Sequence, residues 1–372
     1  MTEKSICFVY NTSQYLFKFR LLLMQKMRSL GYSVFAIAPE DKYSDEFKKH
    51  DIEFIPITLS RKGYNIFNEL YLMVQLYKIY RNISPEIIHQ FTIKPVIFGS
   101  IAARLAGVST IINSITGLGY AFQQGWIIRK ITIVIYQLSL NSTSINNIFQ
   151  NPDDMNEFIK IKISHKNNSH LIPSSGVDMT LFRHIKYTRS IPQIHFLFLS
   201  RMLFDKGLNE LKEAVYLLCE QTTNFTLTLA GEIDRGNPRS VSETWIKTSF
   251  DSPNCEWIGY KEDIVRLLER ADVVVLPSYY REGIPHCLIE ALAASKPIIT
   301  TDMAGCREVI NGNGILIQPK DSNALFRAML EMVNSNKLKN WSKNSFKQAS
   351  KFDINLVNQQ TELVYGVSNE VS

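Results

Sequence analysis

Short apolar runs alternate with amphipathic segments of helix length along this chain, and the alternation starts a second time near residue 194. The first half opens with a predicted strand at 5–10, a helix at 18–30 and a strand at 33–38, which is the start of a βαβ unit. This pattern predicts parallel sheets covered by helices, in two successive α/β domains. Further strands are predicted at 53–57, 87–90, 110–113, 169–173, 194–200, 225–230, 255–258, 273–277, 297–301 and 314–317, with helices at 65–81, 207–220, 285–294 and from 321 onward.

The length and composition agree with two globular domains. At roughly 100 to 200 residues per domain, 372 residues suffice for two, and 45% apolar residues can fill both cores. The five cysteines are scattered without a CxxC pair or a Cys/His cluster, which argues against a zinc site or a disulfide framework. No stretch approaches the ~18 consecutive apolar residues of a membrane-spanning helix, and the first residues do not resemble a signal peptide. The sequence therefore predicts a cytoplasmic protein.

Positive charge is concentrated in the first half of the chain. Residues 1–190 have a net charge of +9, and residues 191–372 have a net charge of −3. Between Phe54 and Pro152, eight basic residues accompany only two acidic ones, amid many aromatic and aliphatic side chains. This mixture suits an anionic membrane surface, where each basic group contributes on the order of 1 kcal/mol, and a solvated basic face is the alternative. No nucleic-acid-binding module accompanies the charge, so nucleic acid is not an expected partner.

Two cationic residues follow the first predicted strand of the second half. Arg201 comes directly after the strand at 194–200, and Lys206 precedes Gly207 at the start of a helix, within the segment SRMLFDKG. Parallel sheets bind ligands at the carboxyl ends of their strands, and two cations beside a helix N-terminus are typical of an anion site. Taken alone, these residues could equally be solvated in a loop.

Two glutamates separated by seven residues follow the strand at 273–277. Glu282 precedes a Gly-Ile-Pro turn, and Glu290 is predicted about two turns inside the next helix. That helix is mostly apolar, so the Glu290 carboxylate needs a polar partner. The two carboxylates could hold two separate hydroxyl-bearing groups, and a structural carboxylate satisfied within the protein is the alternative.

The second half resembles family 4 retaining glycosyltransferases of the GT-B fold in the ordered segments SRMLFDKG, GYKEDIVRLLERADVVVLPS, REGIPHCLIEALAASKPIITTDMAGCREVI and NGILI. The segments HQFTIKPVIFGSIAARLAG and NSITGLGYAF of the first half resemble a narrower group, which extends undecaprenyl-diphosphate-linked sugars in the assembly of bacterial surface polysaccharides such as O-antigen and of N-glycans. Within this group the sequence is most similar to α-1,3-N-acetylgalactosaminyltransferases. The resemblance implies two Rossmann-like domains facing each other across a cleft. The acceptor-binding domain would comprise residues 1–187, the nucleotide-sugar-binding domain residues 188–350, and a terminal helix at 351–372 would return to the first domain.

The resemblance also implies roles for the residues of the second half. Arg201 and Lys206 would bind the donor diphosphate and stabilise the charge that develops on it as the glycosidic bond breaks. Glu290 would accept hydrogen bonds from the ribose hydroxyls, and Glu282 would contact the transferred sugar. The remaining donor contacts are expected from the backbone amides of Gly283 and Ile284, beside the sugar and distal phosphate, and from Gly259 and Tyr260, beside the base.

In the first half, His89 matches the family's histidine beside the reacting sugar, at the carboxyl end of the strand at 87–90. A core histidine is the alternative. Family members often have a glycine-rich loop after the first strand, whereas this chain has none there, so small polar residues would serve instead. A turn that requires glycine is the alternative for the loop at 116–120. The residues expected near a phosphate or the acceptor are Asn11, Thr12, Ser13, Thr92, Lys94, Thr116, Gly117 and Gly119.

The implied reaction is transfer of GalNAc from UDP-GalNAc to an undecaprenyl-diphosphate-linked sugar, on the inner face of a bacterial plasma membrane. Attack from the same face, with the leaving phosphate oxygen removing the proton, fits the lack of an obvious nucleophile, and a double displacement stays open. The sequence has no Asp-x-Asp motif, so no metal is expected. UDP-GlcNAc, UDP-galactose and GDP-mannose are alternative donors, and a nucleotide-sugar 2-epimerase and a non-catalytic assembly subunit are alternative functions.

Overall fold

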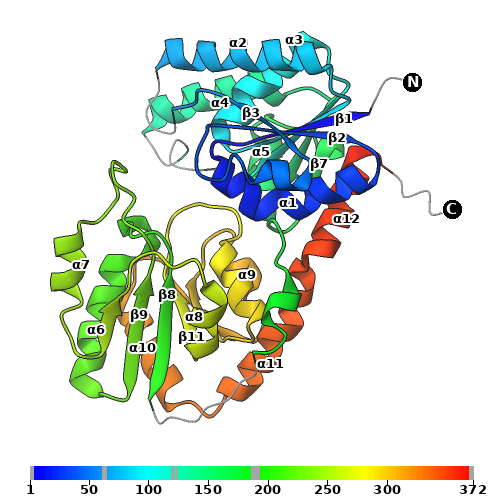
Figure 1. The fold of residues 1–372 in the computed structure, drawn as a ribbon. Helices are drawn as coiled ribbons and strands as arrows, with labels where there is room; N and C mark the ends of the chain where they lie inside the picture. The colour runs from blue at the N-terminus through cyan, green and yellow to red at the C-terminus, as the bar shows by residue number, and fades with distance from the viewer. Residues whose placement is uncertain (1–3, 61–64, 119–121, 123–124, 186–192, 368–372) are drawn as a thin grey trace. The chain divides into compact units, whose positions relative to one another are not determined.

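A computed structural model describes residues 4–60, 65–118, 122, 125–185 and 193–367 (Figure 1). The chain divides into an N-terminal unit of residues 1–175 together with 357–372, and a C-terminal unit of residues 176–356. The last helix, α12 (Ile354–Tyr365), contributes most of its length to the N-terminal unit. The predicted return of the terminal helix is therefore confirmed, and the predicted boundary at 187/188 lies outside the described residues.

Seven parallel strands form the sheet of the N-terminal unit. They are β1 (Ser5–Val9), β2 (Ser33–Ala38), β3 (Glu53–Pro56), β4 (Ile87–Phe91), β5 (Thr110–Ile115), β6 (Ile145–Phe149) and β7 (Ser169–Leu171). Their order is β3-β2-β1-β4-β5-β6-β7, and neighbouring strands pair in parallel throughout. Strands β2 and β3 are thus added on one side of β1, and strands β4 to β7 are added in sequence on its other side.

Helices cover both faces of this sheet. One face packs against α1 (Ser13–Ser29) and α12, and the other packs against α2 (Ile66–Ile83), α3 (Ser100–Ala106), α4 (Trp126–Leu140) and α5 (Pro152–Lys160). Along β1, for example, Phe8 faces the α1 side and Val9 the α2 side. A strand buried on both faces needs apolar residues at every position, which explains the continuous apolar runs in the sequence.

The C-terminal unit repeats this architecture with six strands. They are β8 (Ile194–Leu199), β9 (Phe225–Ala230), β10 (Cys255–Trp257), β11 (Val273–Leu276), β12 (Ile298–Thr301) and β13 (Gly314–Ile317), in the order β10-β9-β8-β11-β12-β13 and parallel throughout. The helices are α6 (Leu208–Gln221), α7 (Glu243–Ser249), α8 (Ile264–Arg270), α9 (His286–Ala293), α10 (Ser322–Asn334) and α11 (Leu338–Ala349). The predicted pair of Rossmann-like domains is confirmed.

The sequence prediction did not include the helices α3, α4, α5, α7 and α8, and two further differences have a clear physical reason. Strand β6 was not predicted, because its sequence INNIF has two central asparagines. Asn147 is nevertheless fully buried, and its Oδ1 accepts a hydrogen bond from Asn113 Nδ2 on β5 at 3.5 Å. Helix α1 begins at Ser13 rather than at residue 18, since Thr12 caps it. Among the described helices, none is long and apolar enough to cross a membrane.

Candidate active site

The carboxyl ends of β8 and β11 form the topological switch point of the C-terminal sheet. These two strands are neighbours, yet the connection after β8 leads to β9 on one side and the connection after β11 leads to β12 on the other. Ligands of open parallel sheets bind at such a point. The predicted Arg201 and Lys206 follow β8, and the predicted Glu282 follows β11, so the fold brings them to this one edge.

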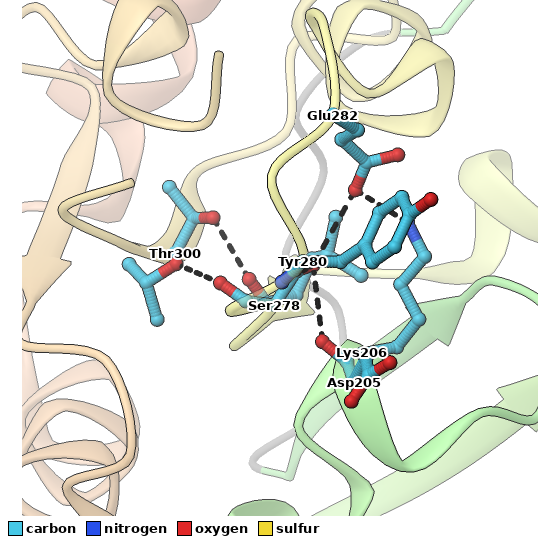
Figure 2. A network of polar contacts seen from close by, with 8 residues as sticks. Asp205, Lys206, Ser278, Tyr280, Glu282 and Thr300 are labelled. Atoms are coloured by element: carbon cyan, nitrogen blue, oxygen red, sulfur yellow. Dashed lines mark hydrogen bonds and ion pairs between the residues drawn. The ribbon is translucent and has the colours of Figure 1, made fainter. Parts of the chain in front are cut away.

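Lys206 and Glu282 form an ion pair at the switch point (Figure 2). The Lys206 Nζ atom donates to Glu282 Oε1, and the ring of Tyr280 lies 5.7 Å from the ammonium. The side chains of Lys206 and Glu282 are only 6% and 21% exposed, so solvent screens their charges weakly. The structure therefore joins two residues for which the sequence indicated separate contacts, one with the diphosphate and one with the sugar.

Hydrogen bonds hold the loop that carries Glu282. Ser278 Oγ donates to Glu282 Oε1 at 3.3 Å. The main-chain oxygen of Asp205 accepts from the N–H groups of Tyr279 and Tyr280 at 3.0 and 3.1 Å, which ties this loop to the one that carries Lys206 (Figure 2). Thr301 Oγ1 donates to the main-chain oxygen of Ser278 from the end of β12. Ser278 was not predicted from the sequence, where its signal is a small hydroxyl residue just after a buried strand.

Gly305 packs against the same loop from the segment that follows β12. Its φ of 82° lies in the left-handed region, and a Cβ atom there would lie 1.8 Å from the main-chain oxygen of Gly283. Only glycine allows this close approach of the two backbones. Gly305 thereby fixes the position of the backbone beside Glu282, and the sequence analysis did not single it out.

Two further ion pairs lie beside this edge. Arg201 Nη1 is 2.7 Å from Asp234 Oδ2, and Arg239 Nε is 2.8 Å from Asp205 Oδ1. The Arg201 side chain is 35% exposed, and a guanidinium has five N–H donors, so the pair with Asp234 leaves donors for an anion. Asp234 and Arg239 lie in the segment between β9 and α7, where no sequence motif indicated them.

Glu290 lies on α9 and pairs with His286 one turn earlier. The distance between Glu290 Oε1 and His286 Nδ1 is 3.0 Å, and His286 Nε2 lies 3.2 Å from the main-chain oxygen of Gly176. Because α9 begins at His286 after the capping Pro285, Glu290 is about one turn inside the helix rather than two. His286 is the polar partner that the apolar helix required. The predicted ribose contact of Glu290 stays a prediction.

The other predicted donor residues lie on loops of the same unit. Gly259 follows β10 and its main-chain oxygen accepts from Gly231 N–H at 2.9 Å, while the neighbouring Tyr260 is exposed. Ile284 follows Gly283 and packs its side chain into the core. The contacts with base, sugar and phosphate stay predictions. In the part of the chain that the structure describes, no cluster of three or more His, Cys, Asp or Glu residues could hold a metal ion.

His89 lies in the middle of β4 rather than at its carboxyl end. The side chain is fully buried, with Nδ1 2.6 Å from Tyr365 Oη on α12 and Nε2 2.7 Å from Ser114 Oγ on β5. Burial lowers the pKa of His89 well below its usual value, and the nearby Arg20 lowers that pKa further, so the ring is neutral at pH 7. Both ring nitrogens are used within the N-terminal unit. A contact between His89 and a reacting sugar stays a prediction.

Several predicted acceptor-side residues serve the N-terminal fold. Thr12 Oγ1 accepts from the Tyr15 N–H at 3.2 Å and caps α1. Ser13 Oγ donates to the main-chain oxygen of Pro39 at 3.0 Å, and Lys94 Nζ is 2.5 Å from Glu69 Oε1 on α2. The contacts of Ser13 and Lys94 did not follow from the sequence, because their partners lie 26 and 25 residues away.

The remaining acceptor-side residues lie after the central strands. Asn11 follows β1 and Thr92 follows β4, so the two come to neighbouring strand ends. Thr116 and Gly117 follow β5, and Gly119 lies outside the described residues. Their contacts with an acceptor stay predictions.

Comparison with known proteins covers both units. Residues 186–348 match the family model for glycosyl transferases group 1, and residues 5–151 match the one for glycosyl transferase 4-like proteins. The chain is 27% identical to the N,N'-diacetylbacillosaminyl-diphospho-undecaprenol alpha-1,3-N-acetylgalactosaminyltransferase of Campylobacter jejuni, over 97% of this chain and 98% of that one. It is 24% identical to the UDP-Gal:alpha-D-GlcNAc-diphosphoundecaprenol alpha-1,3-galactosyltransferase of Escherichia coli, over 78% and 77% of the two chains. The structure of Anabaena HepE in complex with UDP and glucose has the same fold, with a TM-score of 0.78 at 18% identity over 98% and 99% of the chains.

Proposed function

Since the chain is a glycosyltransferase of the GT-B fold, we propose that it transfers GalNAc from UDP-GalNAc to an undecaprenyl-diphosphate-linked sugar, with retention of the anomeric configuration. Its N-terminal part matches the glycosyl transferase 4-like family and its C-terminal part matches glycosyl transferases group 1. The observation that carries the proposal is the pairing of the shielded Lys206 with Glu282 at the C-terminal switch point, beside Arg201. Two cations at that point suit a diphosphate leaving group. The names of the Campylobacter jejuni and Escherichia coli relatives support a lipid-diphosphate acceptor.

UDP-galactose is the first alternative donor to test, because the Escherichia coli relative is named as a galactosyltransferase. UDP-GlcNAc and GDP-mannose are kept as further donors to be tested. Both matched family models are transferase models, so neither the 2-epimerase nor the non-catalytic subunit is carried forward.

In the proposed reaction the acceptor hydroxyl attacks the sugar from the face that the diphosphate leaves. The bond from the anomeric carbon to the diphosphate breaks, a bond to the acceptor oxygen forms, and the leaving phosphate oxygen takes the acceptor's proton. Arg201 and Lys206 stabilise the growing negative charge on the diphosphate. The ion pair with Glu282 orients Lys206 before the substrate arrives. Trapping of a covalent glycosyl-enzyme would contradict this mechanism.

A donor panel tests the proposed function. Purified protein is incubated with EDTA, a polyprenyl-diphosphate-linked GlcNAc or GalNAc acceptor, and one nucleotide sugar at a time, and products are identified by mass. Turnover with UDP-GalNAc and an α-1,3 linkage by NMR is the expected result. Turnover with a different donor would correct the sugar, and dependence of the rate on added divalent metal would contradict the role given to Arg201 and Lys206.

We also propose that the N-terminal unit docks on an anionic membrane through α2 and α4. Both helices expose several large apolar side chains, and the most exposed are Ile66, Phe67, Trp126 and Leu138. Both helices cover the same face of the sheet. The exposed basic residues Lys78, Arg81, Arg104, Arg129 and Lys130 lie on α2, α3 and α4. Apolar side chains beside bases match the interface of an anionic bilayer.

Charge reversal on α4 is expected to weaken vesicle binding. At about 1 kcal/mol for each base near the headgroups, Arg129→Glu with Lys130→Glu should lower the affinity for phosphatidylglycerol-containing vesicles by at least tenfold, and added salt should weaken the wild-type protein. Co-sedimentation measures the effect. Lys18→Glu with Lys26→Glu is the matched control, because it makes the same charge change on α1, which covers the opposite face of the sheet. Equal losses in both variants, or salt-insensitive binding, would contradict docking through α4.

A further inference from the structure

A buried cation in the N-terminal unit has no counter-charge among the described residues. Arg20 lies on the inner face of α1 and is only 5% exposed. No hydrogen bond or ion pair joins its guanidinium to a residue that the structure describes, and its Nε atom is buried without an acceptor. Arginine stays protonated in proteins, so Arg20 is a buried and unpaired positive charge.

An aromatic ring lies against the Arg20 guanidinium. Its Cζ atom lies 4.5 Å from the centre of the Phe91 ring, and Tyr10 stacks on that ring with 5.4 Å between centroids. Attraction to aromatic rings offsets only part of the free energy that a charge loses with its hydration shell. An anion is the partner that balances a charge in this position.

Two further unsatisfied polar atoms lie at neighbouring strand ends of the same unit. Asn11 Oδ1 and Thr92 Oγ1 are buried without hydrogen-bond partners. Asn11 directly follows Tyr10 and Thr92 directly follows Phe91, the two residues whose rings stack beside the guanidinium. Both residues stand at the ends of β1 and β4, which is the topological switch point of the N-terminal sheet. Thr92 has a φ of 68°, a strained value for a β-branched residue.

We propose that Arg20, Asn11 and Thr92 form a sugar-phosphate subsite in the N-terminal unit. The guanidinium binds a phosphate oxygen, Asn11 Oδ1 accepts from a neighbouring sugar hydroxyl, and the Thr92 hydroxyl donates to or accepts from the same group. A sugar phosphate satisfies all three atoms at once. The inference rests on the proposed function in assigning the phosphate to the lipid-linked acceptor, and the donor diphosphate is the other source of the same chemistry.

Binding of inorganic pyrophosphate tests the subsite without any transfer reaction. UDP is held at saturation to occupy the donor site, and pyrophosphate is titrated by calorimetry. The wild-type protein should bind pyrophosphate, and Arg20→Gln should weaken binding by about tenfold or more. Arg28→Gln is the matched control on the same helix, since Arg28 Nη1 donates instead to the main-chain oxygen of Asp51. An affinity of Arg20→Gln within twofold of the wild type, or an equal loss in Arg28→Gln, would overturn the proposal.

Thermal unfolding separates this role from a structural one. Removal of an unpaired buried charge should leave the Tm of the unliganded protein unchanged or higher. A purely structural guanidinium requires the opposite result, a lower Tm with unchanged pyrophosphate affinity. Should Arg20→Gln fail to fold, Asn11→Ala keeps the cation and must still weaken binding of a sugar phosphate such as GlcNAc-1-phosphate, and an unchanged affinity would overturn the subsite.

Steady-state kinetics distinguishes the two sources of phosphate. If the subsite binds the diphosphate of the acceptor, Arg20→Gln should raise the KM for the acceptor. The KM for the donor and the rate of donor hydrolysis without acceptor should stay unchanged. A rise in the donor KM alone would overturn the assignment to the acceptor. The two proposals can fail separately. If Arg20→Gln loses pyrophosphate binding but the wild-type protein transfers no sugar from any donor, the subsite is supported and the proposed function is contradicted.

Discussion

Replacement of Lys206 with alanine is expected to lower kcat about a thousandfold, the size of effect seen when one preorganised donor to a developing charge is removed. The Lys206 side chain is only 6% exposed, so water cannot readily replace its ammonium group, and Glu282 would lose its partner beside the departing diphosphate. Both changes raise the energy of the transition state more than that of the bound donor. Single-turnover rates with radiolabelled donor measure the effect directly.

Lys212→Ala is the matched control for this experiment. Lys212 is exposed on α6, six residues after Lys206, and its removal should leave kcat within about twofold of the wild type because surface substitutions have small effects. The Tm of both variants should be recorded to exclude unfolding. A Lys206→Ala enzyme that keeps a third or more of the wild-type kcat would remove this residue from the proposed mechanism.

Gly305→Ala is expected to destabilise the C-terminal unit by about 3 kcal/mol and to lower kcat/KM by about a hundredfold. The new methyl group would lie 1.8 Å from the main-chain oxygen of Gly283, so the backbone beside Glu282 must move. A shift of the order of 1 Å in a group that positions a substrate is enough for a loss of that size. Chemical denaturation and the donor assay measure the two effects.

Gly312→Ala is the control that distinguishes a steric clash of the new methyl group from the cost of a left-handed backbone conformation. Gly312 also has a left-handed φ, of 67°, but an added Cβ would meet only Asn344 Nδ2 at 3.5 Å, which is an ordinary contact. Its alanine variant should therefore lose only about 1 kcal/mol and keep its activity. If the two variants behave alike, close packing of Gly305 does not position the Glu282 loop.

The sequence predicts the sheets well, because strands buried on both faces must be apolar along their whole length. Strand β6 was not predicted because it has polar residues in its middle. The side-chain oxygen of Asn147 accepts its hydrogen bond from Asn113 on another strand, and no local sequence pattern indicates that bond. In the candidate site, strand ends locate Arg201, Lys206 and Glu282 at one edge. Their pairing does not follow from spacing, because it depends on how two loops approach each other.

The N-terminal unit illustrates the other limit of sequence reasoning. Arg20 lies at helical spacing from the buried Leu16, Leu23 and Met27. The sequence pattern therefore indicates a charged residue on the apolar face of this helix. Whether such a side chain escapes to solvent depends on tertiary packing. The burial of His89 is similar, since Tyr365, one of its two partners, lies 276 residues away.

Because α12 returns to the N-terminal unit, the N-terminal unit is started first during synthesis but can be completed last. The ribosome completes the whole C-terminal unit before it makes Val357 and Tyr365, which belong to the core beneath α1. A nascent chain can therefore close its second unit while its first still lacks a helix and the hydroxyl that bonds His89. A chain interrupted before residue 357 would carry a complete C-terminal unit on an incomplete N-terminal unit. Cellular proteases that recognise incomplete cores are expected to remove such a chain.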